Sequence, residues 1–176
     1  MLYVLKHFQA FAIGACIGSF LNVVIYRLPN NLSIVKPRSF CPQCKKNLTW
    51  RENIPLISWL IQKGQCVNCN RSISFRYPLV EFTTGIFFVI FVDSSPTVYS
   101  SNSNFLINMI FSWAFLSILI CISMIDIDRF WIPQGLINFG FISGLIGLIS
   151  VKIVNNQFID LFLVLKSILF SAIAFL

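Results

Sequence analysis

The chain has 176 residues, of which 57% are hydrophobic and 11% charged, with thirteen lysines and arginines against six acids. Soluble domains average about 45–50% apolar and about 25% charged residues, so this composition excludes an ordinary water-soluble domain. It equally excludes a disordered chain, a coiled coil and a small secreted domain held by disulfides. Several runs reach the length of about 20 apolar residues that a membrane-spanning helix needs, and they predict an integral membrane protein.

Positive charge is concentrated in one polar segment, residues 27–78. This segment holds nine of the thirteen basic residues and a single acid, Glu52, which gives it a net charge of +8. A basic segment of this kind can indicate nucleic-acid binding. Between membrane spans it instead marks the cytoplasmic side, because basic loops are retained there. We therefore predict a cytoplasmic insert and no nucleic-acid partner.

Five membrane spans are predicted in chain order. The first, residues 8–26, is too long for a signal-peptide core and lacks a clear cleavage site, so we expect it to stay uncleaved. After the insert come spans at 79–92, 105–125 and 132–151, and a fifth begins at residue 158. The predicted fold class is an all-α polytopic membrane protein of about five transmembrane helices with a small cytoplasmic insert. We divide it into a first helix (1–26), the insert (27–78) and the later helices (79–176).

The predicted topology follows from the basic insert. With residues 27–78 inside, the N-terminus and the 93–104 and 152–157 loops lie outside, and the polar link 126–129 returns to the cytoplasmic face. The chain stops at residue 176 within an apolar run that has no polar tail. That ending predicts a C-terminally incomplete protein.

Four of the six cysteines form two CxxC pairs separated by 21 residues: Cys41, Cys44, Cys66 and Cys69. Each pair presents two thiolates from one tight turn, which is typical of a tetrahedral structural Zn²⁺ site. An insert with few apolar residues cannot build a large core of its own, and a bound metal ion would stabilise its fold. Redox dithiols and unliganded thiols are the alternatives, whereas a structural disulfide is not expected in the reducing cytoplasm. The two other cysteines, Cys16 and Cys121, are expected to pack as small apolar residues within spans.

Four motifs, in order from residue 14 to about residue 134, resemble one family. They are GSFLNVVIYRLP at 18–29, the cysteine pairs with WRENIPLISWL at 50–60 between them, RYPLVE at 76–81 and DIDRFWIP at 126–133. The chain resembles the type IV prepilin peptidases, the bacterial prepilin leader peptidase/N-methyltransferases. The resemblance implies an inner-membrane enzyme that cleaves type IV prepilins and type II secretion pseudopilins after a glycine. It also implies N-methylation of the new N-terminal residue, usually Phe, with S-adenosyl-L-methionine as methyl donor.

For peptide cleavage, the resemblance implies an aspartic mechanism with two catalytic aspartates. An Asp six residues before Ile-Pro assigns the catalytic position to Asp126 and a variable polar position to Asp128, although Gln134 departs from the usual Asp or Asn. A second carboxylate is needed because one acts as base while the other, kept protonated, acts as acid. The family's second aspartate lies in a Gly-x-Gly-Asp motif, which this sequence lacks. Asp160 is rejected as the partner because the topology places it near the outer face.

For methyl transfer, the sequence contains no glycine-rich loop of the Rossmann type. Glu81 lies just inside the second span, where an ionisable group indicates a function; the alternative is a structural anchor paired with Arg76 or Arg27. Glu52 and Asn53 are the only acid–amide pair of the insert, with a solvated loop as the alternative. We name Glu52, Asn53 and Glu81 as candidate cofactor-binding residues.

One face of the first span carries Gly14, Gly18 and Asn22 at intervals of four residues. The glycines predict close helix packing, and Asn22 is expected to add a hydrogen bond between helices.

Two interpretations of the whole chain stay open. The first is a bifunctional processing enzyme, here in an incomplete copy, that acts on prepilins or pseudopilins in the lipid bilayer. The second is a catalytically inactive, zinc-stapled membrane remnant or scaffold. A Gly-x-Gly-Asp motif encoded downstream would favour the first interpretation. Methyl transfer alone is not expected, because cleavage creates the amine that is methylated.

Overall fold

The computed structural model describes residues 2–94 and 103–154. Its elements are α1 Leu2–Arg27, the 3₁₀ helices η1 Leu28–Asn30 and η2 Arg51–Asn53, α2 Ile57–Ile61, α3 Arg76–Ser94, α4 Ser103–Arg129 and α5 Gln134–Val154. Within these ranges the only β pairing is two isolated bridges, Phe40 with Asn47 and Gln65 with Ser72. The prediction of an all-α fold is therefore confirmed for the described part of the chain.

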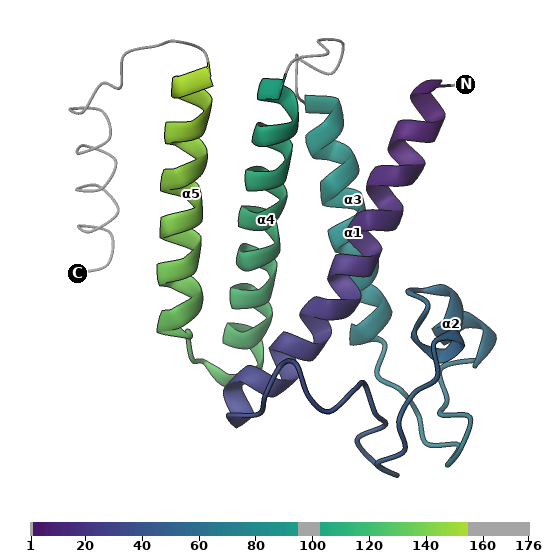
Figure 1. The fold of residues 1–176 in the computed structure, drawn as a ribbon. Coiled ribbons are helices and arrows are strands. Elements are labelled where there is room, and N and C mark those ends of the chain that lie inside the picture. Colours follow the sequence, from purple (N-terminus) through teal and green to yellow (C-terminus); the bar gives the residue numbers. More distant parts are fainter. Residues whose placement is uncertain (1, 95–102, 155–176) are drawn as a thin grey trace.

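The four long helices run between two common levels (Figure 1). α1 packs mainly against α3, and α4 packs mainly against α5, with smaller contacts of α4 to α1 and α3. The insert between α1 and α3 gathers at one end of this bundle, beside the end of α1 and the start of α3. The bundle thus carries its polar insert at a single end.

Two helices of the described part are long and apolar enough to cross a membrane by length and composition. They cover Tyr3–Asn30 and Met109–Arg129, and α5 contributes the shorter apolar stretch Gln134–Gly147. These two helices correspond to the first and third predicted spans and support a membrane protein. The total of five spans stays a prediction, since its fifth member, from residue 158, lies outside the described residues.

The close contact of α1 with α3 is made possible by glycine. A Cβ atom on Gly14 would lie 2.8 Å from the Cα of Gly85, and one on Gly18 would lie 2.7 Å from the Cα of Glu81. Asn22, one turn further along the same face, donates from Nδ2 to the carbonyl of Tyr77 at 3.0 Å. The predicted small, polar face of the first span is confirmed as the face that contacts α3.

Two apolar clusters form the core of the bundle. One joins α1, α3 and α4 near the insert, and its buried members are Leu21, Val24, Ile25, Val80, Cys121 and Ile125. The other lies toward the opposite end, where the rings of Phe88 and Trp113 stack at 4.4 Å. Cys121 is 1% exposed and packs as predicted, but Cys16 is exposed on the outer surface of α1. The packing interpretation of Cys16 is wrong because position 16 lies off the glycine face of its helix.

Each end of the bundle has its own polar contacts. At the insert end, Arg76 pairs with Asp128 of α4, and Arg129 donates to Oδ1 of Asn30 at 3.2 Å. The predicted polar link 126–129 is therefore the last turn of α4, and residues 130–133 form the connection to α5. At the other end, Nε2 of His7 lies 2.6 Å from Oδ1 of Asp93. These contacts place residues 126–129 at the same end as the insert.

Candidate metal centre and adjoining pocket

Both cysteine pairs lie on tight turns of the same build. In the first, the N–H of Lys45 donates to the carbonyl of Cys41 and the N–H of Cys41 donates to the carbonyl of Lys46, both at 2.9 Å. The second repeats these bonds: Asn70 donates to Cys66 at 2.8 Å and Cys66 to Arg71 at 2.9 Å. The residue after each second cysteine has a positive φ, 60° at Lys45 and 53° at Asn70. This backbone brings both thiols of a pair to one side.

The four thiols converge. The Sγ atoms of Cys41, Cys44, Cys66 and Cys69 all lie within 4.8 Å of one another, and Sγ of Cys41 is 3.9 Å from Sγ of Cys69. Zn–S bonds of about 2.3 Å in a tetrahedron separate neighbouring sulfurs by about 3.8 Å. A disulfide needs about 2.05 Å, and all four cysteines are free. The donor set and its spacing fit a four-coordinate zinc ion.

The turns also favour the thiolate form of two of these cysteines. The backbone N–H of Lys46 and the side chain of Asn68 lower the pKa of Cys44 to about 6. The backbone N–H groups of Cys69 and Asn68 lower the pKa of Cys66 in the same way. Hydrogen bonds to the charged form have this effect, and the thiolate is the form that binds a metal.

Arg27, the last residue of α1, organises the approach to the first turn. It is 4% exposed, and its guanidinium donates to the carbonyls of Ser33 at 2.9 Å and Arg38 at 3.2 Å. The same group lies over the ring of Phe40, 5.5 Å from its centre, next to Cys41. A buried Arg that satisfies backbone carbonyls thus links the end of the first helix to the cysteine cluster.

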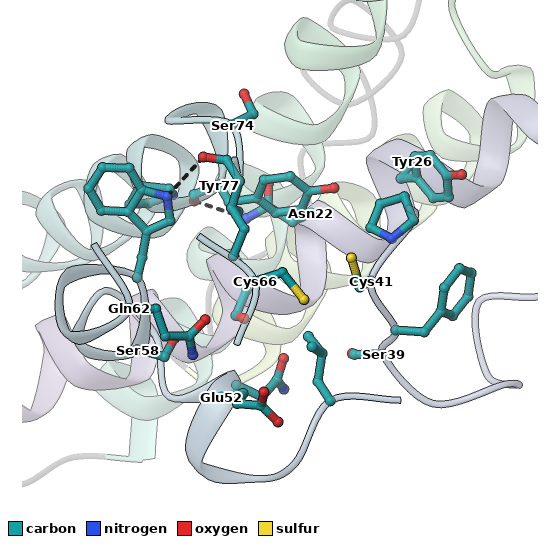
Figure 2. Close-up of a pocket in the computed structure, with 18 of the residues that line it drawn as sticks. Asn22, Tyr26, Ser39, Cys41, Glu52, Ser58, Gln62, Cys66, Ser74 and Tyr77 are labelled. Carbon is teal, nitrogen blue, oxygen red and sulfur yellow. Dashed lines mark hydrogen bonds between the residues drawn. The ribbon is translucent and has the colours of Figure 1, made fainter. Parts of the chain in front are cut away.

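A cavity of about 350 Å³ lies between α1, α3 and the insert. Cys41 and Cys66 form part of its wall, and Figure 2 shows them with the side chains of α1, α3 and the insert arranged around this space. The three candidate cofactor-binding residues, Glu52, Asn53 and Glu81, all line it. The structure therefore brings together residues that are far apart in the sequence.

Glu81 is held from the insert. It is 8% exposed, and its Oε2 accepts the backbone N–H of Leu56 at 2.7 Å. Leu56, just before α2, has a positive φ of 62° and a ψ of −51°. Among the described residues, neither Arg76 nor Arg27 forms an ion pair with Glu81, because Arg76 is engaged by Asp128 and Arg27 by loop carbonyls. If Glu81 acts as a structural anchor, its partner is therefore the backbone N–H of Leu56 and not an arginine.

Glu52 has a local role as well. Its Oε2 accepts from the N–H and the hydroxyl of Thr49 at 2.7 and 2.6 Å. These bonds hold the pKa of the Glu52 carboxyl below its usual value. A Thr with a Glu three residues later is the pattern of a capping box, and here it fixes the turn that leads into η2. Asn53, the next residue, is exposed.

Asn22 is a pocket residue that the sequence analysis assigned only to helix packing. It is 3% exposed and lines the cavity, and its Oδ1 has no hydrogen-bond partner. A buried acceptor without a partner costs about 1–3 kcal/mol, so such an atom marks a place where a ligand donor fits. Three aromatic residues that the sequence motifs did not single out complete the wall: Tyr26, Trp59 and Tyr77. The position of Tyr26 and Tyr77 near the ends of apolar helices is the one sequence feature that points to this site.

Asp126 does not line this cavity. It is exposed in the last turn of α4, where its backbone carbonyl accepts the N–H of Phe130 at 2.8 Å. Asp128, two residues on, forms the ion pair with Arg76. Asp160 lies outside the described residues. The two aspartates of α4 therefore have different surroundings, and only Asp128 is tied to the first residue of α3.

Comparison with known proteins gives a consistent result. Residues 12–94 match the family described as the Bacterial Peptidase A24 N-terminal domain. The chain is 40% identical to a prepilin leader peptidase/N-methyltransferase of Myxococcus xanthus, over 77% of this chain and 38% of that protein. It is 39% identical to a type 4 prepilin-like proteins leader peptide-processing enzyme of Escherichia coli O78:H11, over 74% of this chain and 54% of the relative. It is 37% identical to a prepilin leader peptidase/N-methyltransferase of Bacillus subtilis, over 73% of this chain and 49% of that protein.

The chain thus spans about half, or less, of the length of these relatives. No solved structure gave a significant match. The matched segment contains α1 from residue 12 onward, both cysteine pairs, the residues that line the cavity, and α3. The chain is therefore similar to the prepilin leader peptidase/N-methyltransferases, and its residues 12–94 match the N-terminal domain of the bacterial A24 peptidases.

Proposed function

We propose that this chain is part of a bacterial inner-membrane enzyme that cleaves the leader of type IV prepilins or type II secretion pseudopilins after a glycine and N-methylates the exposed residue. The names of its relatives describe leader processing and methyl transfer. The observation that carries the proposal is the cavity that gathers Glu52, Asn53 and Glu81 beside the four-cysteine cluster. In this proposal the insert, residues 27–78, lies on the cytoplasmic side.

The cavity is the proposed methyl-transfer site. S-adenosyl-L-methionine, when bound, would supply a methyl group on a cationic sulfonium. The rings of Tyr26, Trp59 and Tyr77 offer π faces to a cation. Oδ1 of Asn22 and the carboxylate of Glu81 are acceptors that suit the N–H groups of an amine. These residues would hold and orient the amine that receives the methyl group.

The proposed zinc ion has a structural role. Four thiolates close the coordination shell and leave no open position for a substrate, which is the arrangement of structural sites. Because Cys41 and Cys66 also form part of the cavity wall, the metal would fix that wall. Zinc binding therefore supports methyl transfer through the shape of the pocket.

For cleavage we assign one catalytic carboxylate to Asp126. Proteolysis by aspartates requires a second carboxyl close enough that one of the two stays protonated. Asp128 cannot fill this role while it pairs with Arg76. The partner carboxylate is therefore assigned to a residue outside the described part of the protein.

The methyl-transfer proposal is tested independently of cleavage. The purified chain in detergent is given a synthetic peptide that begins with Phe, as a processed pilin does, together with S-adenosyl-L-methionine. Mass spectrometry is expected to show one added methyl group. Glu81→Gln and Asn22→Leu should each reduce the rate strongly, because the first removes the carboxylate charge from the cavity and the second removes the acceptor Oδ1.

The matched control is Asp93→Asn. Asp93 lies on α3 like Glu81 but at the far end of the helix, next to His7 and away from the cavity. This substitution should leave methyl transfer unchanged. No methylation of the peptide by the unaltered chain would contradict the proposal and favour the inactive scaffold.

A further inference from the structure

The short helix α2 turns its apolar side away from the rest of the protein. Ile57, Leu60 and Ile61 are 53%, 67% and 75% exposed. At 100° per residue these three positions fall on one face of the helix. Ser58 and Trp59, on the other face, line the cavity, and Nε1 of Trp59 donates to the carbonyl of Ile73 at 3.2 Å. An exposed apolar helix face of this kind indicates contact with an apolar neighbour outside the protein.

The depth of α2 is set by its bond to Glu81. The N–H of Leu56, the residue before α2, donates to the side chain of Glu81. Glu81 lies five residues into α3, which is about 7.5 Å along the helix axis from Arg76. Figure 1 shows α2 level with the lower end of α3 and not beyond it. The helix therefore lies beside the first turns of a bundle helix.

Basic residues mark where the headgroups lie at this end. Arg27 ends α1, Arg76 begins α3 and Arg129 ends α4. Cationic side chains at helix ends place themselves at the membrane–water interface. Since α2 is level with the lower end of α3, it lies at the depth of Arg76. Its outward face is therefore expected at the boundary between headgroups and acyl chains.

Charge around α2 agrees with this location. Lys63 follows the helix by two residues, and Arg51 precedes it in η2. The only acid of the insert, Glu52, is already engaged by Thr49. A short apolar helix with neighbouring cations is the combination that binds the surface of an anionic bilayer.

We propose that the outward face of α2, formed by Ile57, Leu60 and Ile61, docks into the interface of the surrounding bilayer, with anionic phospholipid headgroups near Lys63 and Arg51. The wall of the cavity that carries Ser58 and Trp59 is then held from behind by lipid. The cavity consequently lies at the membrane surface and not in the aqueous phase. This inference requires only that the chain spans a membrane, and it holds whether or not either proposed activity is present.

The test uses a photoreactive benzoylphenylalanine at Leu60 in the whole chain, reconstituted in nanodiscs of phosphatidylethanolamine and phosphatidylglycerol. The control carries the probe at Val35, which is 77% exposed but lies in the loop beyond η1. Mass spectrometry after illumination should find several-fold more phospholipid adducts at Leu60 than at Val35. A second probe at Ile57 should give the same result, and Ile61→Asp should reduce the adducts at Leu60.

Three outcomes would overturn the proposal. Equal and low lipid adducts at Leu60 and Val35 would mean that α2 faces water. A covalent dimer formed through Leu60 would show that a second copy of the chain covers this face. If the probe in native membranes instead gave an adduct with a different protein, the face would be a protein-binding site.

Discussion

The four thiols of the cysteine cluster differ in their exposure. Cys41 and Cys66, the first members of the two pairs, are 8% and 5% exposed, whereas Cys44 and Cys69 are half-buried. The first members also contact the cavity, and each closes its turn through its own backbone N–H and carbonyl. Replacing them removes one ligand from each pair and leaves the backbone bonds of both turns available.

The first prediction concerns metal content. The purified chain is expected to contain one zinc ion, and the double variant Cys41→Ser, Cys66→Ser should lose it, because two thiolates cannot complete a tetrahedral site. Structural zinc supplies folding free energy directly, so residues 27–78 should also become more sensitive to protease. Metal analysis of both proteins measures this. Equal zinc in the two samples would contradict the assignment, and Cys121→Ala serves as a control away from the cluster.

The two aspartates at the end of α4 provide the second prediction. In a form of this protein that cleaves prepilin, Asp126→Asn should reduce cleavage by roughly 10²–10⁴-fold, the usual contribution of a general acid or base. Asp128→Asn should be tolerated better, because it loses only an ion pair with Arg76 that is partly exposed. A gel-shift assay of prepilin processing in membranes compares them. Equal loss in both variants would contradict the assignment of Asp126.

At the scale of elements, the contact of α1 with α3 depends on glycines, whose lack of a side chain lets the two backbones come close. A Cβ on Gly18 would approach the backbone of α3, including the carbonyl of Val80 at 3.0 Å, and backbone cannot move aside cheaply. Gly144 in α5 is different, because nothing lies within 4 Å of its added Cβ. The same substitution at these two positions therefore separates helix packing from helix propensity.

The third prediction follows. Gly18→Leu should destabilise the protein by about 1–3 kcal/mol, the usual cost of overpacking, although leucine favours the helix more than glycine does. Gly144→Leu should be neutral or slightly stabilising. Thermal unfolding in detergent, followed by circular dichroism, compares the two variants. Equal stability would show that α1 and α3 can separate without cost.

The sequence predicted the helices more completely than the contacts between them. Apolar runs predicted the helices, and the spacing of Gly14, Gly18 and Asn22 predicted which face of α1 packs, because helical periodicity determines both. The CxxC spacing predicted the cysteine cluster for a similarly local reason. The bond of Leu56 to Glu81 joins residues 25 apart through a residue with positive φ, and no local pattern encodes such a contact or the cavity beside it. The short helix α2 was missed because five residues give too little periodicity.

At the scale of the whole molecule, the polar contacts define two ends. The insert, Arg76–Asp128 and Arg129–Asn30 lie at one end, and His7–Asp93 lies at the other. Basic residues are concentrated at the insert end. A bundle with this asymmetry has one preferred orientation in a membrane.

The fourth prediction is the orientation itself. A reporter fused at Asn70, in the insert, should show cytoplasmic activity, and one fused at Asn102, which lies outside the described residues, should show periplasmic activity. The reason is the excess of lysine and arginine in residues 27–78. Paired enzymatic reporters with opposite compartment requirements measure both sites. A cytoplasmic signal at Asn102 would overturn the topology and, with it, the placement of Asp126.

The glycine contacts between α1 and α3 also bear on the entropy of the insert. Once the two helices associate, residues 28–75 form a loop whose ends are already fixed, so the metal need only close shorter loops within it. Binding of the proposed zinc ion and pairing of the helices are then expected to favour each other, and by linkage each would strengthen the other by the same factor. Removal of the metal by a chelator at the membrane surface is therefore expected to loosen the pairing of α1 with α3 inside the bilayer. Conversely, Gly18→Leu, a change inside the bilayer, is expected to weaken the affinity of the cysteine cluster for zinc.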